Sequence, residues 1–220
     1  MGTNRFTTIA KFQPGVPFVE AYGLLLVSLV LGQNGNPVSV VAITSANDGA
    51  GTTTTALNLG MMVARTGRKS LIVDANLRKP DMHTAFGFDQ APGIAEVLSG
   101  QKQAAEVIRP TNITNLAVLA AGKAAVPPQA LLTPQRLAPL VTDLRGRFEF
   151  IVIDTPPVLR FPDTLNLARI ADGMVLVVPA DGGSRRAQVE ARRRLERVDA
   201  KILGAVLNKV SAREAAALSS

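Results

Sequence analysis

Six short apolar runs, separated by helical stretches, constrain the fold of this chain more than any other feature. Buried strands are predicted at residues 38–44, 70–74, 116–119, 148–154, 173–178 and 202–210. Helices are predicted between them, at residues 56–65, 93–98, 104–108, 134–145 and 185–198. Apolar strands that alternate with helices are typical of a sheet buried on both faces. The sequence therefore predicts the α/β class, with a doubly wound, mostly parallel sheet flanked by helices.

The chain is predicted to have three parts: an N-terminal arm (1–37), one domain (38–210) and a short tail (211–220). The arm holds an apolar run at residues 21–32, which is shorter than the roughly 20 residues of a membrane-spanning helix. Glu20 at its edge and the lack of an A-x-A cleavage pattern after it argue against a signal peptide. We expect a buried or partner-facing helix, with a signal sequence as the alternative, and a soluble, cytoplasmic protein.

Composition excludes several classes of function. Cysteine is absent, so the chain has no disulfide, no thiolate metal site and no cysteine nucleophile. The net charge of +7 permits weak attraction to anionic lipid or nucleic acid. Six arginines crowd the segment 185–197, but Glu190 and Glu196 lie among them, which favours a solvated helix face over a DNA-binding or lipid-facing surface. Aromatic residues make up only 4% of the chain, which further argues against a nucleic-acid partner.

The loop after the first predicted strand resembles a phosphate-binding loop in part. Backbone N–H groups and the helix dipole at the start of the following helix would favour an anion there. The phosphate-loop pattern G-x-x-x-x-G-K-[ST] falls on residues 46–53, where Gly51 and Thr53 match and Ala46 and Thr52 do not. The lysine that would reach the β- and γ-phosphates is therefore a threonine. By itself this loop fits a glycine-rich turn without a ligand equally well.

Two carboxylates at other strand ends strengthen the prediction. Asp74 and Asp154 each end a predicted strand and are followed by a polar turn. The carboxyl ends of strands in a doubly wound sheet gather around one crevice. A threonine hydroxyl and two carboxylates are oxygen ligands that Mg²⁺ accepts. Either acid alone could be a helix-capping residue, but Thr53, Asp74 and Asp154 together indicate a nucleotide site with a metal ion.

These residues give the chain a family resemblance. It resembles the bacterial tyrosine kinases of capsular and exopolysaccharide biosynthesis (the CpsD/CapB type), within the MinD/ParA-like branch of the P-loop NTPases. The similarity covers about residues 18–210. It rests on residues 44–51, 71–80, 93–98 and 148–159, and is extended by Asp163, 171–173 and 204–210.

The resemblance implies a role for each matching residue. The expected cofactor is ATP or ADP with Mg²⁺, bound by Gly49, Ala50, Gly51, Thr52, Thr53 and Thr54, with Asn208 contacting the purine. Catalytic positions would be Asp74, Asn76 and Asp154, and the metal ligands Thr53, Asp74 and Asp154. Such kinases pass phosphate to tyrosines in the tail of a neighbouring subunit. The resemblance also implies a membrane-bound polysaccharide copolymerase or adaptor as a partner, recruitment to the inner face of the membrane, and a homo-oligomer.

The chain departs from the family pattern at positions that bear on activity. Thr52 replaces the phosphate-loop lysine, and Asn76 replaces the second acid of a D-x-D signature. Gly23 and Leu26 stand where an oligomerisation pattern has arginines, and Tyr22 is the only tyrosine. These departures predict a catalytically impaired, pseudokinase-like regulator of polysaccharide synthesis and export.

Two alternatives stay open. An active tyrosine kinase would need a cation from elsewhere, for instance Lys79, Arg78 or Lys123, or from another subunit. The branch-specific lysine of MinD/ParA-like proteins does not supply it, because Asn47 stands at that position. A MinD/ParA-like positioning ATPase is the third possibility.

Overall fold

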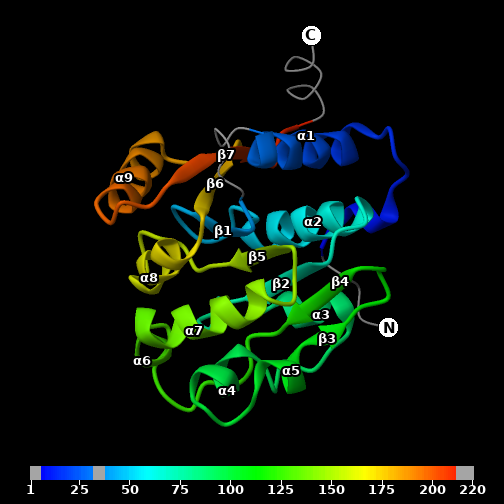
Figure 1. Ribbon diagram of the computed structural model, residues 1–220. Helices are drawn as coiled ribbons and strands as arrows, with labels where there is room; N and C mark the ends of the chain where they lie inside the picture. The colour runs from blue at the N-terminus through cyan, green and yellow to red at the C-terminus, as the bar shows by residue number, and fades with distance from the viewer. Residues whose placement is uncertain (1–5, 32–37, 212–220) are drawn as a thin grey trace.

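The structure, a computed structural model, describes residues 6–31 and 38–211. Its centre is a seven-stranded sheet in the order β3-β4-β2-β5-β1-β6-β7 (Figure 1). The strands are β1 (Val40–Ser45), β2 (Ser70–Asp74), β3 (Arg109–Pro110), β4 (Leu116–Leu119), β5 (Phe150–Asp154), β6 (Gly173–Pro179) and β7 (Ile202–Asn208). All neighbours run parallel except β3 and β4. The predicted fold class is confirmed.

Helices cover both faces of the sheet, which explains why its central strands are apolar throughout. One face packs against α2 (Thr52–Arg65), with α1 (Pro17–Leu31) and α3 (Met82–Phe86). The other face packs against helices from the later part of the chain. These include α4 (Ile94–Leu98), α5 (Ala104–Val107), α6 (Pro128–Leu131), α7 (Pro134–Arg145), α8 (Asp163–Ile170) and α9 (Arg185–Glu196). The site described below lies at the carboxyl edge of β1, β2 and β5.

The structure corrects the predicted elements in several places. The first strand is Val40–Ser45, and the last ends at Asn208 because Lys209 has a left-handed backbone (φ 58°) that cannot continue a strand. The sequence pattern did not predict α3, α6, α8 or the two-residue strand β3. After its first proline, α6 has only Ala130 and Leu131 as apolar positions, which are too few to show a helical period.

The N-terminal arm folds back onto α2. A short 3₁₀ turn, η1 (Ile9–Lys11), is held by Asn58, whose Oδ1 accepts from the backbone N–H of Ile9 at 2.7 Å. The side-chain amide of Asn58 also donates to the carbonyl of Thr7 at 3.0 Å. Arg65, the last residue of α2, donates to the carbonyl of Ile9 at 2.7 Å. The predicted boundary at residue 37 lies outside the described residues, and so does the tail after Ser211.

Helix α1 forms at the apolar run in the arm and buries one of its faces, as expected, while a partner for its other face stays a prediction. Val19, Tyr22, Leu26 and Leu29, spaced three or four residues apart, are buried in the core cluster that α1 shares with α2. Figure 1 shows α1 lying over α2. On the opposite side Leu24, Val27 and Val30 are exposed, by 68%, 51% and 43%. Within the described residues no helix is both long and apolar enough to cross a membrane.

Replacing Asn58 by alanine should loosen the arm. The buried N–H of Ile9 would lose its acceptor, which costs about 1–3 kcal/mol in the free energy of unfolding. Urea denaturation of Asn58→Ala measures this loss. Asn112→Ala, at an exposed position, is the matched control and should change stability by less than about 0.5 kcal/mol. Equal stability of the two variants would show that the arm does not depend on Asn58.

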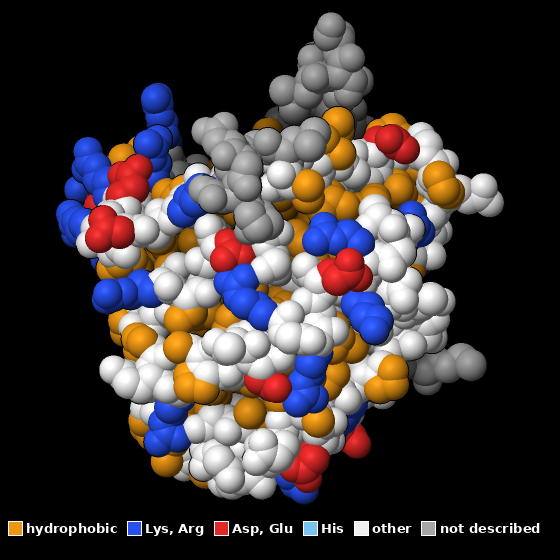
Figure 2. Space-filling view, in the orientation of Figure 1, with side chains coloured by type: hydrophobic (Ala, Val, Ile, Leu, Met, Phe, Trp, Pro, Cys, Tyr) orange, Lys and Arg blue, Asp and Glu red, His pale blue; other side chains and the backbone are white. Residues whose placement is uncertain are grey.

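Helix α9 carries the basic surface expected from the sequence. Figure 2 shows Lys and Arg side chains gathered over this helix, at the upper left of that view. Arg192 pairs with Glu196 (2.6 Å) and Arg194 with Glu190 (3.4 Å), each four residues apart. These exposed pairs fit the predicted solvated helix face.

Candidate nucleotide-binding site

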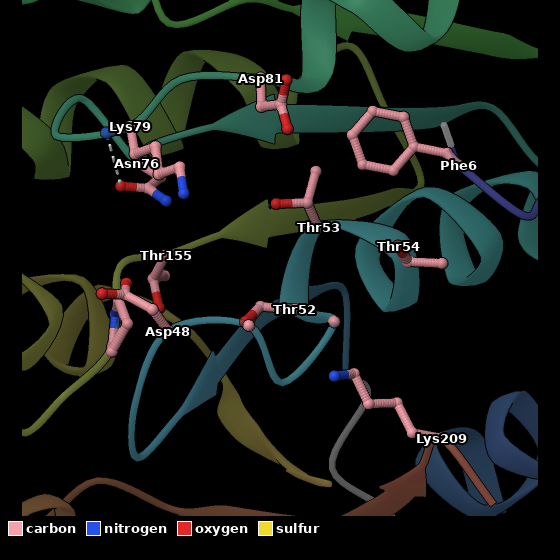
Figure 3. A pocket seen from close by; sticks show the side chains of 13 residues that line it. Phe6, Asp48, Thr52, Thr53, Thr54, Asn76, Lys79, Asp81, Thr155 and Lys209 are labelled. Carbon is pink, nitrogen blue, oxygen red and sulfur yellow. Dashed lines mark hydrogen bonds between the residues drawn. The ribbon is translucent and has the colours of Figure 1, made fainter. Parts of the chain in front are cut away.

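The loop between β1 and α2 has a backbone geometry suited to holding an anion. It carries two glycines in the left-handed region, Gly49 (φ 79°) and Gly51 (φ 94°), and α2 begins directly after it at Thr52. The positive end of the helix dipole and several backbone N–H groups therefore face the same space. A cavity of about 310 Å³ opens there (Figure 3). It is lined by Phe6, Asp48, Gly49, Gly51, Thr52, Thr53, Thr54, Asn76, Lys79, Asp81, Thr155, Pro157 and Lys209.

Asn208 braces this loop from the end of β7. Its Nδ2 donates to the carbonyl of Ala50 at 2.8 Å. A Cβ added at Gly51 would lie 2.0 Å from the same Nδ2 and would displace this amide, and the φ of 94° favours glycine at this position. The expected contact of Asn208 with a purine stays a prediction, because the structure shows the amide engaged with the loop.

Thr53, Asp74 and Asp154 come together as the sequence predicts. Asp74 and Asp154 are register neighbours at the ends of β2 and β5. The Thr53 hydroxyl donates to Oδ2 of Asp154 at 2.6 Å, and the other oxygen of Asp154 is buried without a partner. The two oxygens of Asp74 accept from the backbone N–H groups of Asn76, Asp81 and Met82 at 3.1–3.3 Å.

Burial perturbs both carboxyl groups. Loss of solvation raises the pKa of Asp74 to about 7, against the lowering effect of its backbone hydrogen bonds. The pKa of Asp154 is also raised well above its ordinary value, first by burial and then by the negative charge of Asp74. Two adjacent buried carboxylates therefore disfavour the doubly ionised state unless a cation compensates it.

The residues present fit a magnesium ion. The partnerless oxygen of Asp154 and the hydroxyl of Thr53 offer two hard ligands beside the loop between β1 and α2. Among the described residues, no group of three or more His, Cys, Asp or Glu side chains could hold a metal by itself. Mg²⁺ is commonly bound by one or two such protein ligands together with water and substrate phosphates. The ion would thus depend on a nucleotide for the rest of its coordination.

The position of the expected lysine is occupied by a short polar side chain. Thr52 donates from its hydroxyl to Oγ of Ser45 at 3.3 Å and adds no charge to the cavity. Of the three alternative cations considered, only Lys79 lines the cavity. Arg78 instead pairs with the buried Asp163 at 2.9 Å and lies over the ring of Phe161, which makes it a poor candidate for the missing cation.

Several residues of the cavity were not expected to be part of the site. Phe6 reaches it from the arm, and Asp48, Asp81 and Thr155 come from the loops after β1, β2 and β5 (Figure 3). The sequence could have indicated Thr155 as a residue of the site, because it directly follows the predicted Asp154. The sequence could not have indicated Phe6, because the position of this residue depends on the way the arm packs on α2.

Comparisons with known proteins place this site in a class. The family model of an AAA domain (AAA_31) matches residues 38–186. The chain is 32% identical over 200 residues to the tyrosine-protein kinase YwqD of Bacillus subtilis, covering 91% of this chain and 84% of that protein. It is 32% identical over 192 residues to the tyrosine-protein kinase CpsD of Streptococcus pneumoniae, covering 87% and 84%. The protein is thus a P-loop NTPase of the AAA type, and within that class it belongs to the bacterial tyrosine-protein kinase family.

Solved structures agree with this assignment. The kinase domain of the Escherichia coli tyrosine kinase ETK has a TM-score of 0.89 at 26% identity, covering 97% of this chain and 84% of that one. The chimerical protein CapA2B2 has a TM-score of 0.87 at 31% identity, covering 92% and 89%. The septum site-determining protein MinD of Pyrococcus horikoshii, complexed with Mg-ADP, shares the fold with a TM-score of 0.67 at 24% identity, covering 80% and 73%.

Proposed function

We propose that this protein binds Mg²⁺ with ATP or ADP and regulates capsular or exopolysaccharide synthesis, with greatly reduced phosphoryl transfer. The cavity at the start of α2, together with Thr53 and Asp154, supports the binding of a Mg-nucleotide. When bound, the magnesium ion would neutralise phosphate charge. The proposed loss of catalysis rests on Thr52, an uncharged side chain at the place where the phosphate-loop pattern has lysine.

The residues of the chain would divide the binding among them. Backbone N–H groups of the loop 49–53 would hold the phosphates at the helix N-terminus. Thr53 and Asp154 would hold the ion. Asp74 would orient the segment that follows β2 through its hydrogen bonds to residues 76–82. Phosphoryl transfer depends on positioning and on charge neutralisation at the transferring group. A phosphate loop without its lysine therefore still positions the phosphates but neutralises less of the negative charge at the transferring group.

The burial of the only tyrosine supports a regulatory role. Tyr22 is 5% exposed and packed against α2, and burial raises the pKa of its phenol. It is not placed to accept phosphate in the folded chain, and the sequence of the tail 211–220 contains no tyrosine. We propose a membrane-bound copolymerase or adaptor as partner, which would recruit the protein to the inner face of the membrane. A homo-oligomer remains part of this proposal.

An active tyrosine kinase is the second candidate. Lys79 and Lys209 both line the cavity, so two ammonium groups are available where the loop lacks its own. Such a kinase would have to phosphorylate a tyrosine on another protein.

Binding and turnover of ATP in the same preparation distinguish these candidates. We expect calorimetry to detect binding of Mg-ATP to the wild type. We expect phosphate release to stay near background in both the wild type and Asp154→Asn. Asp89→Asn, which removes an exposed carboxylate, is the matched control. Turnover that Asp154→Asn abolishes and Asp89→Asn leaves intact would refute the impaired state and favour the active kinase. Lack of any nucleotide binding would refute both.

A further inference from the structure

The carboxyl end of β7 is fixed against the phosphate loop. Asn208, its last residue, donates to the carbonyl of Ala50 in the loop at 2.8 Å. The carbonyl of Asn208 in turn accepts from the backbone N–H of Ala180 at 2.8 Å. Lys209 follows with a left-handed backbone (φ 58°), which turns the chain sharply at this point. The backbone of Lys209 is therefore held close to the loop from which a lysine is missing.

The side chain of Lys209 reaches the cavity where the phosphates would lie. It lines the 310 Å³ cavity together with Gly51, Thr52 and Thr53. In Figure 3 it points from the end of β7 toward the loop that carries Thr52. It also lines a neighbouring cavity of about 180 Å³, which is bounded by residues 47–50 and 181–184. Lys209 thus lines both cavities that border the phosphate loop.

The present partner of Lys209 is easily exchanged. Its Nζ lies 3.6 Å from Oδ2 of Asp181, and the two side chains are 44% and 62% exposed. Exposed pairs of this kind contribute little, because both charges remain solvated. Arg78 differs, since its partner Asp163 is almost fully buried and the pair cannot part without leaving a buried charge. A phosphate in the cavity could therefore replace Asp181 as the partner of Lys209.

We propose that Lys209 contacts the phosphates of the bound nucleotide and strengthens its binding, with Asp181 as its partner when no nucleotide is bound. Lys209 approaches from the end of β7, so it does not replace the lysine that the first turn of α2 lacks for phosphoryl transfer. This inference rests on the proposed binding of a Mg-nucleotide. It identifies the residue that keeps such binding strong in a loop without lysine. Lys79 lines only the first of the two cavities and comes from the other side of the site, after Asn76 (Figure 3).

Calorimetric titration of the full chain with Mg-ADP and with Mg-AMP tests this role. Lys209→Met should weaken Mg-ADP binding about tenfold or more, since a charge-assisted contact is lost, and should weaken Mg-AMP binding less. Lys209→Arg should keep most of the affinity. Lys201→Met, at the exposed position just before the same strand, is the matched control and should bind as the wild type does. Asp181→Asn should bind Mg-ADP at least as tightly as the wild type.

The outcomes separate the inference from the proposed function. If the wild type binds no Mg-ADP, the proposed function fails, and this inference with it. If the wild type binds and Lys209→Met binds equally well, only the role of Lys209 is refuted. An equal loss of Mg-ADP affinity in Lys209→Met and Lys209→Arg would also refute this role, because the affinity would then not depend on the positive charge. Thr52→Lys introduced into Lys209→Met should restore the affinity for Mg-ADP. If it does not, a lysine at position 52 cannot replace Lys209 at the phosphates, which would contradict the inference.

Discussion

Thr52→Lys is expected to raise the rate of ATP turnover about 100-fold or more. One preorganised electrostatic contact to a developing charge is commonly worth that much in rate. Thr52 lines the cavity at the first turn of α2, and the 310 Å³ of space gives a longer side chain room to extend toward the phosphates. The new ammonium group would restore the lysine of the phosphate-loop pattern without altering Thr53 or Asp154. Phosphate release under saturating Mg-ATP measures the effect.

The control for this substitution adds the same charge to the same cavity. Thr54 lines it as well, but stands two residues further along α2. Thr54→Lys should leave turnover near the wild-type level, because its charge does not stand at the loop position. If Thr52→Lys is no faster than the wild type, then the missing lysine does not limit this protein, and the proposed impairment is wrong.

Asp74→Asn is expected to change the pH dependence of stability. The folded-state pKa of Asp74, about 7, lies above its ordinary value of 3.8 because the carboxyl is fully buried. The folded state therefore binds the proton more tightly, and this carboxyl makes the protein less stable as the pH rises from about 4 to about 7. The amide of the variant does not titrate, so Asp74→Asn should lose less stability than the wild type between pH 5 and pH 8.

Urea denaturation at these two pH values isolates the effect. Asp74 accepts from three backbone N–H groups, so the amide costs stability at both pH values and the difference between them is the informative quantity. Asp89→Asn removes an exposed carboxylate and should follow the wild type. An Asp74→Asn variant with the same pH dependence as the wild type would contradict a raised pKa at this position.

The sheet and the convergence of its loops could be predicted because both depend on local pattern. Apolar runs ending in Asp74 and Asp154 indicate parallel strands, and the carboxyl ends of such strands meet at one edge. The glycines of the loop likewise indicate the left-handed turns that Gly49 and Gly51 adopt.

The remaining parts of the site depend on contacts between distant segments. Lys209 approaches the loop only because Asn208 binds Ala50, which lies 158 residues earlier in the chain. Phe6 reaches the cavity only because the arm is held by residues of α2. Arg78 could not be excluded from the sequence, because its partner Asp163 is brought to it by the packing of α8. No spacing within the chain signals these arrangements.

A crystal structure of the protein with Mg-ADP tests the central claim most directly. We expect phosphates in the loop 49–53 at the start of α2, with Mg²⁺ beside Thr53 and Asp154 and the ammonium group of Lys209 turned from Asp181 to a phosphate oxygen. Phosphates bound away from this loop, or a loop left without nucleotide at saturating Mg-ADP, would contradict it.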